Sequence, residues 1–374
     1  MGRSTRARGI FTDVEGCKTV DKQYKGQRIY ARLGKISQDD AEAWLGRQIN
    51  AVRKAKLFGD RPERTFREAT IRYLTEARKR SIDVDALHIR QLDPFIGDLL
   101  LHQVHDGALA SFKRQRLTVD KVSQTTVKRA LEVVRHILHI AENWRDENGI
   151  TWLERAPRIT MPTQAELRQR QPYPLTWEEQ QLLFELLPKR LADMALLKVN
   201  TGCREQEVCS LRWRWEQPVP ELETSVFVLP GEFVKNDRPR LVVLNAVARA
   251  VLESCRGQHP EFVFHRRGLR LMTMNNTGWQ RARERAADAY LEKFDRPAPE
   301  GFRRIRVHDL KHTFGRRLRA AGVGFETRQV LLGHHNGSVT THYSAAEIGE
   351  LLEAVNRIDA TRCTPAMTLL RAVA

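Results

Sequence analysis

The stretch His308-Asp-Leu-Lys-His-Thr-Phe314 places a histidine and a lysine three residues apart, at the head of a segment, 307–321, with helical periodicity. Residues at this spacing share one face of a helix, so the side chains of His308 and Lys311 are expected to point to the same side. Taken alone, such a pair occurs more often in a helix cap or a packed core than in a functional site. The weight of the motif therefore depends on the residues before and after it.

An arginine precedes this stretch at a tight corner of the chain. Arg204 lies in Thr201-Gly-Cys-Arg-Glu-Gln-Glu207. Gly202 allows the positive φ that ends one helix, and Arg204 stands near the start of the next. Glu207 follows one helical turn later and is expected to hold the guanidinium in its orientation. The corner thus predicts an arginine that points outward.

A lysine follows on a predicted hairpin. Lys235 comes just before the Asn236-Asp237 turn, which joins two β-rich segments, 224–229 and 241–244. A turn signal between two such segments indicates antiparallel strands. Lys235 is therefore expected at the hairpin tip.

A histidine and a tyrosine complete the set. His334 follows Gly333 at the end of a helix expected over 325–332, and Tyr343 comes nine residues later. A tyrosine hydroxyl can act as a covalent nucleophile, and a histidine or lysine can transfer a proton to or from a reacting oxygen. Attack on a phosphodiester builds negative charge on the phosphate oxygens, which positioned cations stabilise. The residue types therefore suit phosphoryl transfer on a nucleic acid.

The order of these motifs resembles the tyrosine recombinase family, the phage-type integrases and their relatives. The pattern is Thr-Gly-x-Arg-x-x-Glu, a hairpin lysine, His-Asp-Leu-Lys-His-Thr-Phe, Leu-Leu-Gly-His and a tyrosine nine residues beyond. The resemblance covers residues 174–358 and extends more loosely over 65–145, which is similar to the family's core-site-binding domain. The first 60 residues resemble the arm-site-binding modules of some phage integrases.

The resemblance implies two strand transfers through a 3′-phosphotyrosine intermediate, without metal and without ATP or any other cofactor. It implies a role for each residue of the set. Tyr343 is the expected nucleophile, Arg204 and Lys311 contact the phosphate, Lys235 is the acid for the leaving 5′-oxygen, His308 is the base, His334 bonds the phosphate, and Glu207 supports Arg204.

Lys311 departs from the family pattern, which has arginine at this position. Lysine keeps the charge but lacks the planar guanidinium with its two parallel donors. Phosphate contact is expected in a weakened form. A compensating contact from Arg316 or Arg317, farther along the same helix, stays open.

The charge of the whole chain agrees with a polyanionic partner. The 374 residues contain 63 Lys and Arg against 46 Asp and Glu, a net charge of +17 that is spread along the chain. Hydrophobic residues make up 41%, which is enough to form cores and excludes wholesale disorder. Such a basic globular chain most often faces a polyanion, and the alternative on charge alone is a soluble basic protein without such a partner.

The sequence predicts a cytoplasmic protein of a bacterial or phage-infected cell, associated with the nucleoid. No apolar run approaches the length of a membrane span, and no apolar segment follows the basic N-terminus as in a secretory signal. The five cysteines include no Cys-x-x-Cys pair, which argues against a zinc site or a disulfide scaffold.

The predicted fold is mainly α with small antiparallel β elements (α+β). Three domains are expected: a small α/β module over 1–60, a helical DNA-binding domain over 61–165, and a catalytic domain over 166–374 that ends in a C-terminal helix. By resemblance, the two larger domains would close on DNA as a clamp. In the helical domain, a helix is expected over 123–144 and a shorter one over 92–101.

Three basic residues of the helical domain are expected to lie against the duplex: Lys121, Lys128 and Arg129. The resemblance further implies double-stranded DNA as partner, a homotetramer on DNA, a host DNA-bending protein and an excision factor. The apolar stripe over 345–358 is expected to pack on its own domain or to dock on a neighbouring protomer.

Three alternatives stay open on sequence alone. His308 and His312 have the spacing of two zinc ligands on a helix, but Asp309 stands where the Glu of His-Glu-x-x-His would be. A DNA-binding regulator that has lost catalysis would share the charge and the helical domain. A type IB topoisomerase resembles the same catalytic set.

Overall fold

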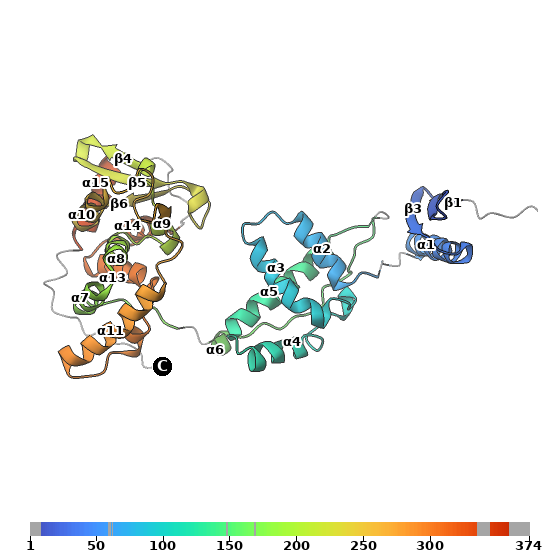
Figure 1. Cartoon of the computed structure of the whole chain (residues 1–374), viewed down its shortest axis with the longest axis horizontal. Helices are drawn as coiled ribbons and strands as arrows, with labels where there is room; N and C mark the ends of the chain where they lie inside the picture. Colours follow the sequence, from blue (N-terminus) through green and yellow to red (C-terminus); the bar gives the residue numbers. More distant parts are fainter. Residues whose placement is uncertain are drawn as a thin grey trace, which may run out of the picture. The chain divides into compact units, whose positions relative to one another are not determined.

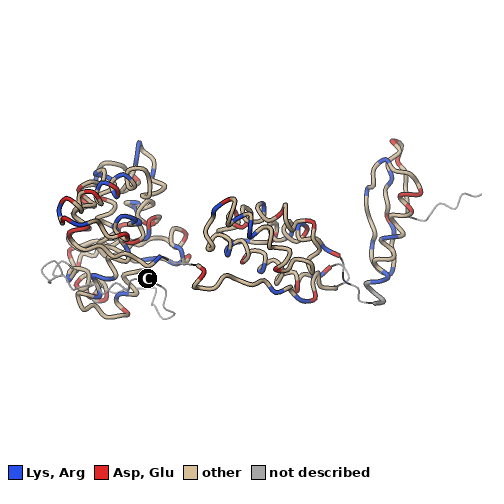
Figure 2. The backbone as a smooth tube through the Cα atoms, turned by 90° about the horizontal axis from the view of Figure 1, so that it is seen from below, with Lys and Arg blue, Asp and Glu red and all other residues tan. Residues whose placement is uncertain are grey.

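The computed structural model describes residues 9–58, 61, 63–146, 149–167, 170–334 and 345–358. The chain divides into two compact units, Met1–Gln169 and Arg170–Ala374. In the described residues, helices predominate and the sheets are small and antiparallel (Figure 1). The predicted fold class is therefore confirmed. Lys and Arg occur along the backbone of both units (Figure 2).

The chain begins with a three-stranded antiparallel sheet followed by one helix. The strands are β1 (Ile10–Thr12), β2 (Lys18–Tyr24) and β3 (Gln27–Gly34), in that order across the sheet. Helix α1 (Gln38–Phe58) packs on β2 and β3. A small apolar core joins them, formed by Val20, Ile29, Leu45 and Val52. These strands and this helix agree with the α/β composition expected for the region.

The rest of the first unit is a helical body. A single apolar core joins its helices, because each turns one apolar face inward. The elements are α2 (Phe66–Glu76), α3 (Ile82–Ile96), η1 (Leu101–Gln103), α4 (Ala110–Arg114), η2 (Gln115–Val119), α5 (Gln124–Ala141) and α6 (Gln164–Leu167).

One predicted helix of this body was misplaced. The segment 92–101 was expected to be helical, but α3 begins at Ile82 and ends at Ile96. Pro94 lies inside the last turn of α3 instead of interrupting a later helix. The prediction was wrong because it was based on Pro94 and Gly97, which can interrupt a helix. The acidic first turn with Asp83 and Asp85 marks the true start of α3.

The second unit combines a helical core with a small sheet. The sheet order is β4-β5-β6, all antiparallel, and β7 and β8 form a separate two-stranded ribbon. The strands are β4 (Glu216–Val219), β5 (Thr224–Leu229), β6 (Arg240–Val243), β7 (His265–Arg266) and β8 (Leu269–Arg270), with single 3-10 turns at 213–215, 220–222 and 231–233.

The helices of this unit surround one large apolar core, and several of them pack in pairs. The closest pairs are α7 with α11, α8 with α10 and α8 with α13. The helices are α7 (Trp177–Leu186), α8 (Lys189–Thr201), α9 (Glu205–Cys209), α10 (Ala246–Cys255), α11 (Thr277–Phe294), α12 (Glu300–Arg303), α13 (Asp309–Ala320), α14 (Phe325–Leu331) and α15 (Ala345–Asn356).

The apolar stripe of α15 packs on its own unit. Leu351, Val355 and Ile358 are buried in a cluster with Phe314 of α13 and Leu331 of α14, and α15 contacts β6 and α14. The structure thus takes the first of the two arrangements expected for this helix.

Helix α8 ends where the site described below begins. Its C-cap, Gly202, has φ +61°, and a Cβ there would lie 2.5 Å from the Phe314 ring. Only glycine fits this combination of positive φ and close approach. The corner that carries Arg204 is therefore set directly on α13.

Within the part of the chain that the structure describes, no helix is both long and apolar enough to cross a bilayer.

Candidate active site

Arg204 is held at the corner between α8 and α9 by Glu207. Its backbone N–H donates to Glu207 Oε2 at 2.6 Å, and its Nη1 donates to Oε1 at 3.0 Å. The carboxylate is buried, with 1% exposure. Burial would raise the pKa of Glu207, but the charge of Arg240 and the hydrogen bonds from Arg204 lower it overall. Glu207 is therefore a fixed anion that orients Arg204.

Lys311 extends from α13 into the same corner. Its ammonium donates to the carbonyl of Gly202 at 2.9 Å and to the carbonyl of Leu332. The side chain is 5% exposed. Burial, together with the nearby charges of Arg240 and Arg204, lowers the pKa of Lys311 to about 6. A lysine with this pKa is mostly uncharged at neutral pH until an anion approaches it.

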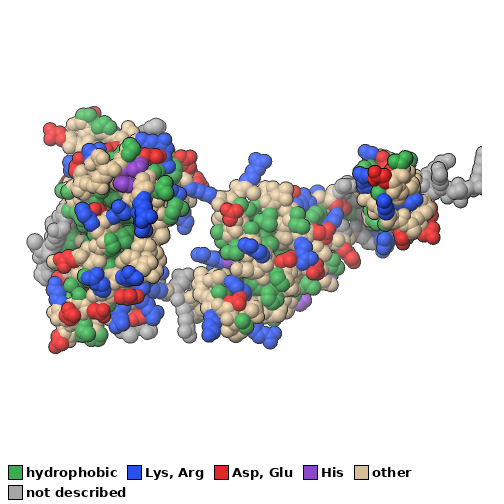
Figure 3. All heavy atoms as spheres, viewed as in Figure 1, with side chains coloured by type: hydrophobic (Ala, Val, Ile, Leu, Met, Phe, Trp, Pro, Cys, Tyr) green, Lys and Arg blue, Asp and Glu red, His purple; other side chains and the backbone are tan. Residues whose placement is uncertain are grey.

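Histidine side chains lie near basic side chains on one face of the second unit (Figure 3). His308 and His334 lie near the cluster, because the charge of Lys311 acts on both of them. The rings of His308 and His312 stack edge to face, with centroids 5.0 Å apart. Partial desolvation, with the charges of Lys198 and His312, lowers the pKa of His308 to about 4. His334 Nδ1 lies 3.0 Å from Gln329 Oε1, and its pKa is also lowered, first by desolvation. The neutral imidazoles can accept or donate hydrogen bonds near neutral pH.

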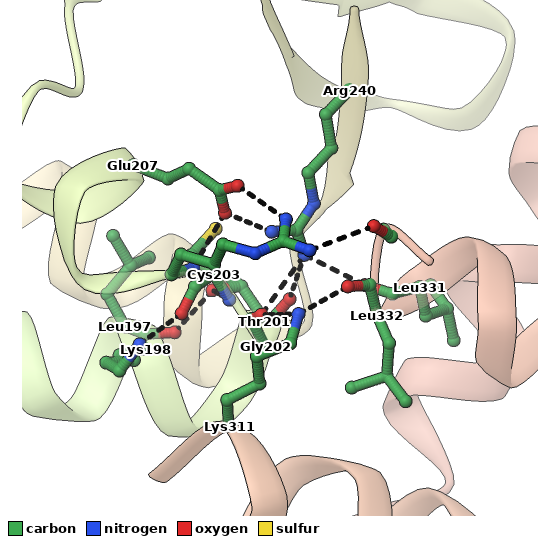
Figure 4. A network of polar contacts seen from close by, with 12 residues as sticks. Leu197, Lys198, Thr201, Gly202, Cys203, Glu207, Arg240, Lys311, Leu331 and Leu332 are labelled. Carbon is green, nitrogen blue, oxygen red and sulfur yellow. Dashed lines mark hydrogen bonds and ion pairs between the residues drawn. The ribbon is translucent and has the colours of Figure 1, made fainter. Parts of the chain in front are cut away.

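Arg240 is the residue that the sequence analysis missed. It opens β6 and is 4% exposed. Its guanidinium forms an ion pair with Glu207 and donates to the carbonyls of Thr201 at 3.3 Å, Gly202 at 3.2 Å and Leu331 at 3.0 Å (Figure 4). The one available signal was an arginine at the head of the apolar run Leu241–Leu244. The same pattern is equally typical of an exposed arginine at a strand end, so it does not distinguish a buried arginine from an exposed one.

Three basic side chains meet three successive carbonyls at the end of α14. Arg240 donates to Leu331, Lys311 donates to Leu332, and Arg204 Nη2 makes a long contact of 3.5 Å to Gly333. The last carbonyls of a helix lack intrahelical partners and carry partial negative charge. Two helix ends, those of α8 and α14, therefore help a single carboxylate to hold Arg204, Arg240 and Lys311 together.

A fourth amine lies behind the corner. Lys198 of α8 is fully buried and donates to the carbonyl of Cys203. Burial lowers its pKa to about 8. This contact supports the backbone immediately before Arg204. With so much positive charge around one carboxylate, the corner is suited to an anion such as a phosphodiester.

Lys235 stands apart from this network. Lys235 is exposed on the β5–β6 connection, five residues before Arg240, and takes no part in the contacts of the cluster described above. Tyr343 lies outside the described residues. The structure therefore brings together Arg204, Glu207 and Lys311, with His308 and His334 beside them.

Arg317 does not compensate for Lys311. It donates to Gln180 Oε1 at 2.7 Å, and its guanidinium carbon lies 3.4 Å from the centre of the Trp177 ring. These contacts tie α13 to α7. Its guanidinium is thus committed elsewhere in the unit.

The three expected DNA contacts of the helical body differ in their surroundings. Lys121 is exposed and has φ +51°, just before the start of α5. Lys128 lies 3.5 Å from Glu132 on the same helix, and Arg129 is exposed beside it.

Among the residues that the structure describes, no three His, Cys, Asp or Glu side chains are grouped as a metal site.

The chain is similar to known integrases and tyrosine recombinases. Residues 175–349 match the model of the phage integrase family. The chain is 24% identical to the integrase of Salmonella phage P22, over 89% of this chain and 90% of that protein. It is 28% identical to a tyrosine recombinase of Pseudothermotoga lettingae, over 64% of this chain and 76% of that protein.

The fold is also similar to a solved structure. The crystal structure of a lambda integrase tetramer bound to a Holliday junction matches with a TM-score of 0.54. The match is 15% identical in sequence and covers 89% of this chain and 97% of that chain. At this identity the similarity establishes the fold.

Proposed function

We propose, from the premise that the chain belongs to the phage integrase family of tyrosine recombinases, that it is a site-specific recombinase. It cuts and rejoins DNA through a 3′-phosphotyrosine intermediate and so integrates or excises a mobile element. The observation that carries the proposal is the cluster of Arg204, Arg240 and Lys311 around the buried Glu207. Such a cluster stabilises a phosphate whose negative charge increases during reaction.

The proposed cleavage step is a balanced displacement. The Tyr343 oxygen forms a bond to the scissile phosphorus, and the bond from phosphorus to the 5′-oxygen breaks. His308 accepts the tyrosine proton, and Lys235 protonates the leaving 5′-oxygen. Arg204 and Lys311 bind the phosphate oxygens, and His334 donates a hydrogen bond to them. Attack by the freed 5′-hydroxyl of another strand reverses these steps and restores Tyr343.

The proposed partners follow from the same premise. The duplex would be bound by the helical domain, 61–165, through Lys121, Lys128 and Arg129, and by the catalytic domain, 166–374, with the two closing as a clamp. The module over 1–60 would bind accessory arm sites. The lambda integrase structure is a tetramer on a Holliday junction, and we propose a homotetramer on DNA here, assisted by a host DNA-bending protein and an excision factor.

A suicide substrate tests the proposal. The probe is a duplex carrying the direct repeat that borders the mobile element, with a nick just 3′ of the cleavage site. After cleavage, this nick lets the short fragment that carries the freed 5′-hydroxyl diffuse away. We expect a covalent protein–DNA adduct that resists denaturation. Absence of adduct on any border sequence would support a DNA-binding regulator instead. Relaxation of supercoiled plasmids that lack the border sequence would support a topoisomerase.

Lys311 should give cleavage an unusual pH dependence. Because the DNA-free protein holds its pKa at about 6, the charged form declines as pH rises above that value. At subsaturating DNA, the cleavage rate is then expected to fall by up to about tenfold per pH unit through this range. Lys311→Arg stays charged, so its profile should be flatter and its activity equal or higher.

The groups that face Lys311 set this limb of the profile. They are Arg204 and Glu207 at α9, Arg240 of β6 and Cys203 at the corner. Lys311→Ala is expected to cleave weakly at every pH. The measurement is the rate of adduct formation between pH 5.5 and 9. A profile of the same slope in wild type and Lys311→Arg would exclude the lysine as the titrating group, and equal rates in wild type and Lys311→Ala would remove its role.

A further inference from the structure

Arg240 connects parts of the second unit that are far apart in the sequence. Its guanidinium joins Glu207 of α9, the carbonyls of Thr201 and Gly202 at the end of α8, and the carbonyl of Leu331 at the end of α14. Figure 4 shows these groups converging on its side chain from different elements. The side chain is 4% exposed, so these contacts occupy a closed environment in which hydrogen bonds to a charged group are strong.

The backbone of Gly333 packs closely against the Arg240 side chain. A Cβ at Gly333 would lie 2.6 Å from Arg240 Nε and 2.8 Å from its Cδ, and the residue has φ +59°. The turn at the end of α14 therefore packs its backbone directly on the Arg240 side chain. His334 is the next residue, so the position of its backbone depends on that packing.

Arg240 also acts on Arg204, through Glu207. The carboxylate binds Arg240 with Oε2 and the Arg204 side chain with Oε1. Without Arg240, Glu207 would be buried with one partner removed, an arrangement that costs free energy and loosens orientation. Only a planar guanidinium can reach a carboxylate and several carbonyls together, because a lysine offers one compact charge.

We propose that Arg240 is a positioning residue of the strand-transfer reaction, which sets Arg204 through Glu207 and His334 through the turn 331–333. It acts through these residues and does not itself contact the phosphate. The proposal rests on the proposed function, because it names the residue that assembles the phosphate site of that reaction. It is distinct from the role of Lys235, which lies on the same β5–β6 connection but outside this network.

The test compares Arg240→Gln and Arg240→Lys with a buried arginine elsewhere in the unit. Arg317→Gln is the matched control, because Arg317 is 5% exposed and donates to a side chain in another helix. The measurements are the single-turnover rate of adduct formation at saturating DNA, the affinity for DNA, and the thermal unfolding midpoint.

We expect Arg240→Gln to slow adduct formation by about 100-fold while DNA affinity changes by less than about threefold. Arg240→Lys should fall between Arg240→Gln and wild type. Arg317→Gln should lower the unfolding midpoint by a similar amount yet retain the wild-type rate. Wild-type rates in both Arg240 variants would overturn the proposal. If Arg240→Gln does not fold, the rate of folded Arg240→Lys is the test, and a wild-type rate in that variant would overturn the proposal.

Two further readouts separate positioning from general destabilisation. In a double-mutant cycle, Arg240→Gln should slow His334→Ala by much less than it slows wild type, because both changes disturb the same turn. Fully additive losses would count against the proposal.

A 5′-phosphorothiolate substrate, whose leaving group needs no acid, should restore cleavage by Lys235→Ala but not by Arg240→Gln. Restoration of both would place Arg240 with the acid and overturn the positioning role. A wild-type protein that forms no adduct overturns the proposed function as well, whereas an active wild type beside an equally active Arg240→Gln overturns the positioning role alone.

Discussion

Replacing Tyr343 by phenylalanine should abolish the covalent protein–DNA adduct while changing DNA affinity by less than about twofold, because only the attacking oxygen is removed. The aromatic ring, and with it the shape of the side chain, is retained. The measurement is adduct formation on the nicked border duplex, followed on a denaturing gel, with affinity measured in parallel. No other step of the reaction can proceed without this bond, so this is the largest effect expected of a single substitution.

Tyr290→Phe is the matched control for this substitution. Tyr290 of α11 is buried at 6% exposure and stacks on Phe294 and Phe302, away from the cation cluster. It loses the same hydroxyl and should form adduct at the wild-type rate. A persistent adduct in Tyr343→Phe would assign the nucleophile to a different residue.

Replacing Arg204 by alanine should lower the rate of adduct formation by about 1,000-fold, because a charged donor to the phosphate is lost at the point where charge builds up. Arg204→Lys keeps the charge and should lose less. Affinity for DNA and its salt dependence should change little, since most phosphate contacts lie elsewhere along the duplex. The loss is therefore expected in the rate at saturating DNA.

Arg212→Ala provides a control of nearly equal exposure. The side chains of Arg212 and Arg204 are 20% and 21% exposed, and each forms an ion pair with a glutamate. Arg212 pairs with Glu261 and lies over the rings of Trp215 and Phe262. Arg212→Ala should cleave at close to the wild-type rate. If Arg204→Ala and Arg212→Ala were equally active, Arg204 would have no special part in the reaction.

The sequence predicted the elements that depend on local signals. Gly202, the glycine after α8, has the expected positive φ. Periodicity located α5, α13, α14 and α15 to within a few residues, because each turns one apolar face to a core. Strand β4, with Pro218 in it, carried no such signal.

Part of the site could also be predicted from the sequence, where the contacts are local. Arg204 and Glu207 are close in sequence, so their contact follows from helix geometry. The burial of Lys311 and the position of Arg240 depend on how α8, β6, α13 and α14 pack together. Such contacts join residues far apart in the chain, and no local pattern encodes them. The arginine that the sequence analysis overlooked is therefore the one whose partners are all distant.

The close packing of Gly333 on Arg240 changes how the Leu-Leu-Gly-His motif is understood. Read as a string, the motif is a label by which related chains are recognised. In the folded protein, Gly333 of this motif is a glycine because the side chain of Arg240 packs directly on it, and Arg240 belongs to β6, far earlier in the chain. The two positions constrain each other: a larger residue at 333 would displace the arginine, and loss of the arginine would leave a hole. Part of a catalytic signature can thus record a neighbour's shape instead of chemistry of its own.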